Sequence, residues 1–111
     1  MLVFSILLAA MAPSPAAAVD NSRAVFTKCL RDHLKKSLEA KMGEAEYELA
    51  LKETCGTERD AFRTAIIALD RADGDTAAEA AEDADSQVED YHATFIDKFK
   101  DYTETKTMPA D

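Results

Sequence analysis

The sequence predicts an all-α protein, an antiparallel three-helix bundle whose first hairpin is bridged by a disulfide. Proline, which breaks helices, is absent between Pro15 and Pro109, and glycine occurs only at Gly43, Gly56 and Gly74. Apolar residues recur at spacings of three and four, the period of one helix face, and no segment alternates as a strand does. The 111-residue chain has room for a single domain.

The first 18 residues carry no charge and have the order of a secretory signal. An apolar run from Leu2 to Ala12 is followed by prolines at 13 and 15 and by three alanines that suit a cleavage site. A basic residue usually begins such a signal, and none does here. The run spans 11 residues, whereas a membrane-spanning helix needs about 20. We predict a signal peptide at 1–18, cleavage near Ala18, a periplasmic or secreted location and no stable membrane insertion, with an uncleaved anchor as the alternative.

The first helix is predicted from about Asn21 to Ala40, inside a helical domain at 19–103. A side-chain oxygen of Asp20, Asn21 or Ser22 can cap the free amides of its first turn. The segment Lys41–Gly43 ends it, because a glycine can take a left-handed cap. Its predicted buried face is formed by Phe26, Cys29, Leu30, His33, Leu34, Ser37 and Leu38.

The second helix is predicted to run without interruption from Glu44 to about Ala72. One glycine, Gly56, lies inside it and costs only about 1 kcal/mol. A break at Gly56, with Thr57 capping a new helix, is the competing interpretation. The apolar stripe keeps its phase across the glycine and consists of Tyr47, Leu51, Cys55, Phe62, Ile66 and Leu69.

A turn at Asp73–Thr76 is predicted to separate the second helix from the third. Gly74 suits the end of one helix, and Asp75 or Thr76 can cap the next, which runs to about Thr103. The remaining segment, 104–111, lacks a pattern and is predicted to be a flexible tail. The stripe of this third helix is Ala77, Ala81, Ala84, Val88, Tyr91, Phe95, Phe99 and Tyr102.

Two cysteines are the strongest constraint in the sequence. Cys29 lies about thirteen residues before the turn at Met42–Gly43 and Cys55 about twelve after it, so both reach the same height in an antiparallel hairpin. An exported protein meets an oxidising compartment, where such a pair forms a disulfide. We therefore predict a Cys29–Cys55 bridge. The alternatives are two free thiols or a zinc or copper site made by Cys29, His33 and Cys55.

Other chemistry finds little support in the sequence. A thiol redox enzyme usually has two cysteines separated by two residues, whereas these are 26 apart. The segment Asp70–Asp75 fails the calcium-loop template, because Leu69 and Arg71 would fall at ligand positions. No glycine-rich phosphate loop, serine elbow or zinc-protease motif occurs in the sequence. We expect no catalytic residue, no cofactor, no resident metal and no enzyme activity.

The net charge of −9 is concentrated in one segment, since residues 70–90 carry nine acids against Arg71 alone. Such a field repels nucleic acid and anionic membranes. The segment is either a solvated helix face, an ion buffer or a docking surface for a basic protein partner. Its acids are Asp70, Asp73, Asp75, Glu79, Glu82, Asp83, Asp85, Glu89 and Asp90.

These observations favour a non-enzymatic exported binding or interaction protein. The alternative is an envelope acid-stress chaperone, because the 22 carboxylates lose their charge between about pH 5 and 3 and leave the basic residues unbalanced. That loss could loosen the bundle and expose the aromatic stripe. The sequence does not predict an oligomeric state.

The Cys29-Leu30 pair and the later Cys55, followed by Glu58-Arg59-Asp60-Ala61-Phe62, resemble the layout of a group of short exported bacterial proteins. That resemblance covers most of the chain after the signal. It implies export and a bridged helical hairpin, and no activity is assigned to the group. Small exported acid-stress chaperones share the size, the helices and one cysteine pair, but their cysteines are spaced more widely.

Overall fold

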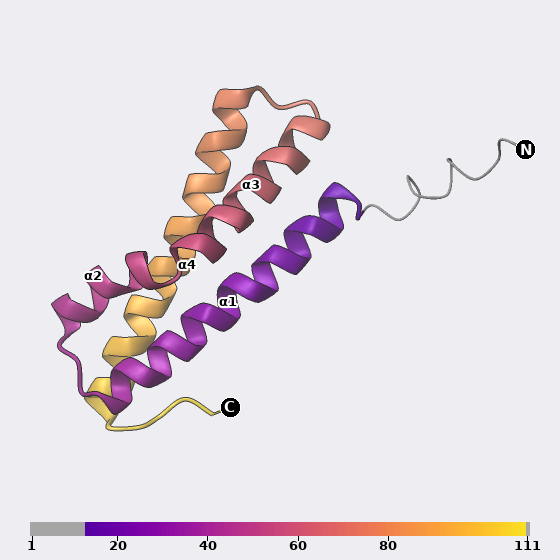
Figure 1. The fold of residues 1–111 in the computed structure, drawn as a ribbon. Helices are drawn as coiled ribbons and strands as arrows, with labels where there is room; N and C mark the ends of the chain where they lie inside the picture. Colours follow the sequence, from indigo (N-terminus) through magenta and orange to yellow (C-terminus); the bar gives the residue numbers. More distant parts are fainter. Residues whose placement is uncertain (1–12, 111) are drawn as a thin grey trace, which may run out of the picture.

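The computed structural model describes residues 13–110, and this part of the chain is all-α (Figure 1). It contains four helices rather than the predicted three. They are α1 (Pro15–Glu39), α2 (Glu44–Thr54), α3 (Gly56–Ala72) and α4 (Ala77–Thr105). Of the predicted signal peptide, residues 1–12 lie outside the described residues.

Helix α1 begins six residues earlier than predicted, at Pro15 instead of Asn21. The side chain of Ser14 accepts a hydrogen bond from the backbone N–H of Ala17. Proline suits the first helical position, because a backbone N–H at that position has no partner within the helix. The predicted cleavage site after Ala18 thus falls in the first turn of α1. Val19, directly after that site, is buried in the core.

The predicted continuous second helix is wrong, because α2 and α3 meet at a break. A single residue, Cys55, separates them with φ −106° and ψ 29°. It serves both helix ends, and no side chain caps α3, so the alternative cap at Thr57 is not used either. Arg59 spans the break by donating from Nη1 to the backbone oxygen of Lys52 over 2.9 Å. As a result α2 points away from the line of α3 (Figure 1).

The predicted turn before the last helix is confirmed. Gly74 has φ +104°, a left-handed conformation that favours glycine. Thr76 caps α4 through a capping box, in which its side chain accepts from the backbone N–H of Glu79 and the Glu79 carboxylate accepts from the Thr76 N–H. Helix α4 ends at Thr105, two residues beyond the prediction, at Lys106 in a left-handed conformation.

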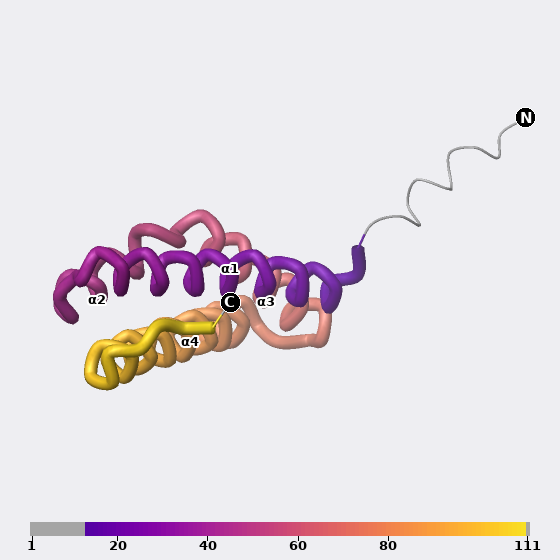
Figure 2. The backbone as a smooth tube through the Cα atoms, turned by 90° about the horizontal axis from the view of Figure 1, so that it is seen from below, coloured from indigo at the N-terminus to yellow at the C-terminus, as the bar shows by residue number. Residues whose placement is uncertain are grey.

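The core lies between α1, α3 and α4, with α2 packed across one end (Figures 1 and 2). Rings from three helices meet at its centre, where Phe26 stacks on Phe62 at 5.6 Å and meets Tyr91 edge-on at 5.9 Å. In α4 the buried alanines are Ala80 and Ala84, whereas Ala77 of the predicted stripe is exposed. The predicted stripes of α1 and of α2 with α3 otherwise face the core or its edge.

Candidate functional site

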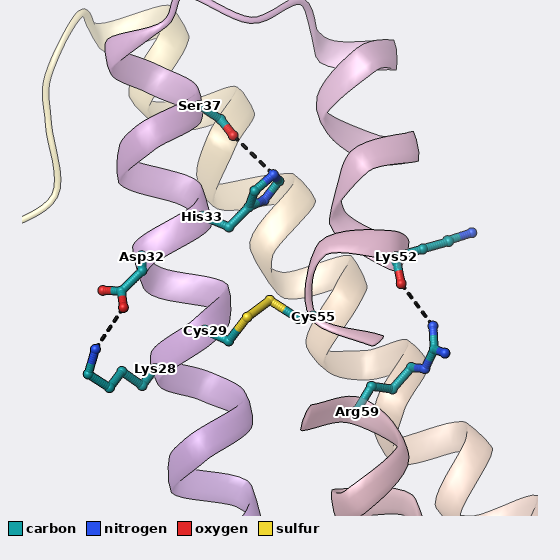
Figure 3. The surroundings of a disulfide bond; sticks show 8 residues. All are labelled: Lys28, Cys29, Asp32, His33, Ser37, Lys52, Cys55 and Arg59. Carbon is teal, nitrogen blue, oxygen red and sulfur yellow. Dashed lines mark hydrogen bonds and ion pairs between the residues drawn. A yellow bond between two sulfur atoms is a disulfide. The ribbon is translucent and has the colours of Figure 1, made fainter. Parts of the chain in front are cut away.

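The predicted disulfide is present between Cys29 of α1 and Cys55 at the α2–α3 break (Figure 3). The S–S distance is 2.08 Å and the Cα atoms lie 5.9 Å apart. Both sulfurs are thereby bonded to each other, so the alternative zinc or copper set loses its two thiolates. Within residues 13–110 no group of three potential metal-ligating side chains comes together.

His33, the third residue of that alternative set, has a structural environment next to the bridge. Its Nε2 lies 3.3 Å from the Ser37 hydroxyl (Figure 3). Its ring stacks on Tyr47, with 5.3 Å between the ring centres. Tyr47 in turn stacks on Phe99 at 4.1 Å and is fully buried. Burial lowers the pKa of His33 and raises that of Tyr47, because each neutral form is favoured away from water.

A second histidine, His92 of α4, is buried in the core, which the sequence analysis did not foresee. Its ring meets Phe26 edge-on at 6.1 Å, and its Nε2 has no hydrogen-bond partner among the described residues. Burial lowers its pKa, with the nearby charges of Arg59 and Lys52 adding to the shift. The side chain is a neutral packing group at pH 7.

Most of the predicted acidic surface gathers at one end of the molecule, around the α3–α4 turn (Figure 1). We call this the acidic end, and every member except the half-buried Asp70 is exposed. Glu89 and Asp90 lie further along α4, and Asp90 lines a different surface. The acidic end consists of Asp70, Asp73, Asp75, Glu79, Glu82, Asp83 and Asp85.

Few cations compensate the acidic end. Arg63 of α3 pairs with Asp85 of α4 at 2.6 Å. Arg71 donates to the backbone oxygen of Asp75 at 3.0 Å and so fastens the turn. The hydrogen bond to Arg63 lowers the pKa of Asp85, and the capping hydrogen bonds lower that of Glu79. Both carboxyls are therefore fully ionised at neutral pH.

Asp70 and Asp83 form a carboxyl pair across the α3–α4 interface. With both ionised, Oδ2 of Asp70 is enclosed and has no hydrogen-bond partner among the described residues. A hydrogen bond shared with Asp83 raises the pKa of Asp70 to about 6, and loss of water and repulsion from Asp83, Asp75 and Asp73 add to the rise. The acidic end is thus crowded enough to hold a proton near pH 6.

A groove of the opposite charge runs between the second halves of α1 and α4. It contains two adjoining hollows of about 330 and 350 Å³, which share Arg31, Phe95 and Lys98. Two acids, Asp32 and Asp90, also line it. We call it the α1/α4 groove, and its bases and rings are Lys28, Arg31, Lys35, Lys98, Tyr91, Phe95 and Tyr102.

Residues 107–110 fold back beside the α1/α4 groove (Figures 1 and 2). After the left-handed Lys106, the Thr107 N–H donates to the Tyr102 backbone oxygen over 3.1 Å. Pro109 and Ala110 then line the hollow of about 350 Å³ together with α1 side chains. A third hollow, of about 620 Å³, lies between this segment, Met42 and the end of α4.

Sequence reasoning missed the groove because residues 20–69 carry equal numbers of acids and bases and sum to zero. The signal was nevertheless present. Lys28, Arg31 and Lys35 are spaced by three and four, so they fall on one face of α1, as the apolar residues do. Their partner Lys98 is 63 residues from Lys35, and only the fold brings it near.

No family model matches this chain, and neither a curated protein nor a solved structure matches it. None of the helices that the structure describes is sufficiently long and apolar to cross a membrane.

Proposed function

We propose that this protein is a non-enzymatic exported binding protein that recognises a basic segment of a partner protein through its acidic end. The observation that carries the proposal is the separation of charge along the molecule. Six of the seven carboxyls at the acidic end are exposed, and Arg63 is the side chain there with an ion pair to one of them. An uncompensated field of this kind attracts cations and speeds the encounter with a basic surface.

The carboxyl pair gives the proposal a pH signature. A bound lysine or arginine side chain stabilises the ionised form of Asp70, whose pKa is raised to about 6. Binding therefore releases a proton near that pH, and by linkage the affinity for a basic peptide increases as the pH rises from about 5 to 7. A solvated helix face without a partner gives no such saturable binding.

The test uses a fluorescent lysine-rich peptide titrated with the purified protein at low salt. We expect saturable binding that weakens with salt and with acidification through about pH 6. Replacing Asp75 and Glu82 with Asn and Gln should weaken it, whereas Asp97→Asn, further along α4, should not. Absence of binding, or equal affinity of the Asp97 and acidic-end variants, refutes the proposal. The natural partner can then be captured from the exported fraction by comparing the same variants.

Export itself rests on the signal pattern and is supported by the disulfide, which persists in oxidising compartments. Cleavage after Ala18 removes the first turn of α1 and leaves the buried Val19 at the new N-terminus. We predict that material from the periplasm or medium has an intact mass that begins at Val19. Recovery of the protein in the cytoplasm with residues 1–18 still attached contradicts this prediction.

A second candidate function, the acid-stress chaperone, is favoured by the buried His92 and the half-buried His33. Their pKa values are lowered, so the unfolded chain takes up protons more readily than the folded one as the pH falls below about 6.5, and stability is lost. Loosening at low pH would expose the aromatic core to client proteins. A client-aggregation assay at about pH 3 separates the two candidates: protection there favours the chaperone, and its absence removes this candidate.

A further inference from the structure

The α1/α4 groove is remote from the acidic end and opposite to it in charge. We propose that it binds an extended acidic peptide segment of a partner protein, in the space that the chain's own residues 107–110 now border. The inference goes beyond the proposed function, because it concerns another surface and a ligand of the opposite charge.

The charge of the groove favours carboxylates. Four bases line its two hollows against two acids. Lys28 is paired with Asp32 at 2.7 Å and Lys35 also has an interaction partner, so the charges considered for a ligand are those of Arg31 and Lys98. The pairing lowers the pKa of Asp32, so that pair stays ionised and neutral overall at pH 7. The side chain of Arg31 forms no hydrogen bond or ion pair with the described residues, although its charge contributes to the lowered pKa of Asp32. Its planar guanidinium can grip a carboxylate through two parallel hydrogen bonds.

The floor of the groove is apolar and aromatic. Phe95 lines both hollows and is 4% exposed, and Tyr91 and Tyr102 continue the floor on either side of it along α4. The ammonium of Lys98 lies 5.3 Å from the Phe95 ring centre. This cation–π contact holds a positive charge directly above an apolar surface. A ligand that combines small apolar residues with carboxylates matches both features.

The chain itself indicates the shape of the occupant. Residues 107–110 are not helical, and the half-buried Pro109 and the following Ala110 line one hollow of the groove together with α1 and α4 side chains. An extended backbone with small apolar side chains therefore fits there without any change in the helices. Thr107 is held by its backbone hydrogen bond to Tyr102, whereas Pro109 has no backbone N–H to donate. A partner segment that adds carboxylates has the advantage of Arg31 and Lys98.

The test titrates the purified protein against a fluorescent peptide with Pro-Ala at its centre and glutamates on both sides. We expect saturable, salt-sensitive binding of this peptide. The same peptide with lysines in place of the glutamates should not bind at the groove. Arg31→Glu combined with Lys98→Glu should weaken binding at least about tenfold. The matched control is Lys52→Glu on α2, which reverses an exposed charge outside the groove (Figure 3) and should leave the affinity unchanged.

Two further measurements keep the test decisive. Arg31→Gln is a milder variant, and a helical circular dichroism spectrum with an unchanged melting temperature shows that lost affinity is not lost folding. Replacing both Met108 and Pro109 with Ser should tighten peptide binding several-fold, because the internal segment then competes less well. Equal affinities of the Arg31 and Lys52 variants overturn the proposal.

Other occupants of the groove give distinct results that also overturn it. Binding of anionic phosphatidylglycerol vesicles without binding of the acidic peptide assigns the groove to a membrane surface. Self-association in sedimentation that disappears with Arg31→Glu, again without peptide binding, assigns it to the acidic end of a second copy. The lysine-peptide arm separates this test from the proposed function, because acidic-end variants affect that arm and Arg31 variants do not.

Discussion

Replacing both Cys29 and Cys55 with alanine should destabilise the fold by about 3.5 kcal/mol, mainly because the unfolded chain regains the freedom that the bridge removes. The bridge closes a loop with a sequence separation of 26, and loop-closure entropy for that length gives about 3.5 kcal/mol at about 25 °C. The loss of two sulfur atoms adds to this, since Cys55 is 1% exposed and its sulfur fills core space. For a small domain the melting temperature should fall by about 15–25 °C.

The effect should also be uneven along the chain, because the bridge lies at the α2–α3 break. No side chain caps the start of α3 there, and the disulfide links the α2–α3 junction directly to α1. The short helix α2 otherwise relies on Tyr47 and Leu51 for its buried contacts. Without the bridge, we expect the amide hydrogens of α2 to exchange with solvent sooner than those of α3.

The assay is thermal unfolding followed by circular dichroism, with hydrogen exchange by mass spectrometry on the same two proteins. A single Cys29→Ala variant would leave a free thiol, so the double variant is the appropriate comparison. A fall in melting temperature below about 5 °C would refute the entropic reasoning. Two thiols available to a blocking reagent in unreduced protein from the oxidising compartment would refute the bridge itself.

Two further predictions follow from particular contacts. Asp70→Asn should raise stability at pH 7 by less than about 1 kcal/mol after solvent screening. The folded pKa of Asp70 is raised from 3.8 to about 6, so this carboxyl lowers stability as the pH rises from 3.8 to about 6. The gain should therefore vanish at about pH 3.5, which urea titrations at both pH values will measure. Thr76→Ala should lower the free energy of unfolding by about 1 kcal/mol, because it removes the hydroxyl that accepts from the Glu79 N–H in the capping box. The same urea titration measures this loss, with Thr64→Ala on the exposed side of α3 as the control. Equal losses for the two variants would contradict the capping role of Thr76.

Local rules of the chain were enough to predict several parts of the structure. The helix cap at Asp75 or Thr76, the helix end at Gly74 and the Cys29–Cys55 pairing depend on residues close in sequence or equally distant from one turn. Such features need little knowledge of the rest of the fold. The predicted start of α1 is six residues too late, because a proline such as Pro15 suits both the end of a signal and the first position of a helix.

Tertiary structure decided the features for which the sequence allows two conformations of similar free energy, such as a continuous or a broken helix at Cys55. The stripe from Tyr47 to Leu69 keeps its phase whether the helix continues or bends at Cys55, because one non-helical residue shifts the two halves without removing either apolar face from the core. The burial of His92 was equally invisible, since it depends on Phe26 of another helix.

Of the two charged surfaces, one could be predicted from the sequence and the other could not. The acidic end could be predicted from sequence, because its carboxyls are consecutive along the chain and the turn at Gly74 merely folds the segment on itself. The α1/α4 groove could not, because Arg31 and Lys98 are 67 residues apart and each has acids beside it in sequence. Helical periodicity sorts those charges by face, and only the packing of α1 against α4 turns two separate faces into one surface.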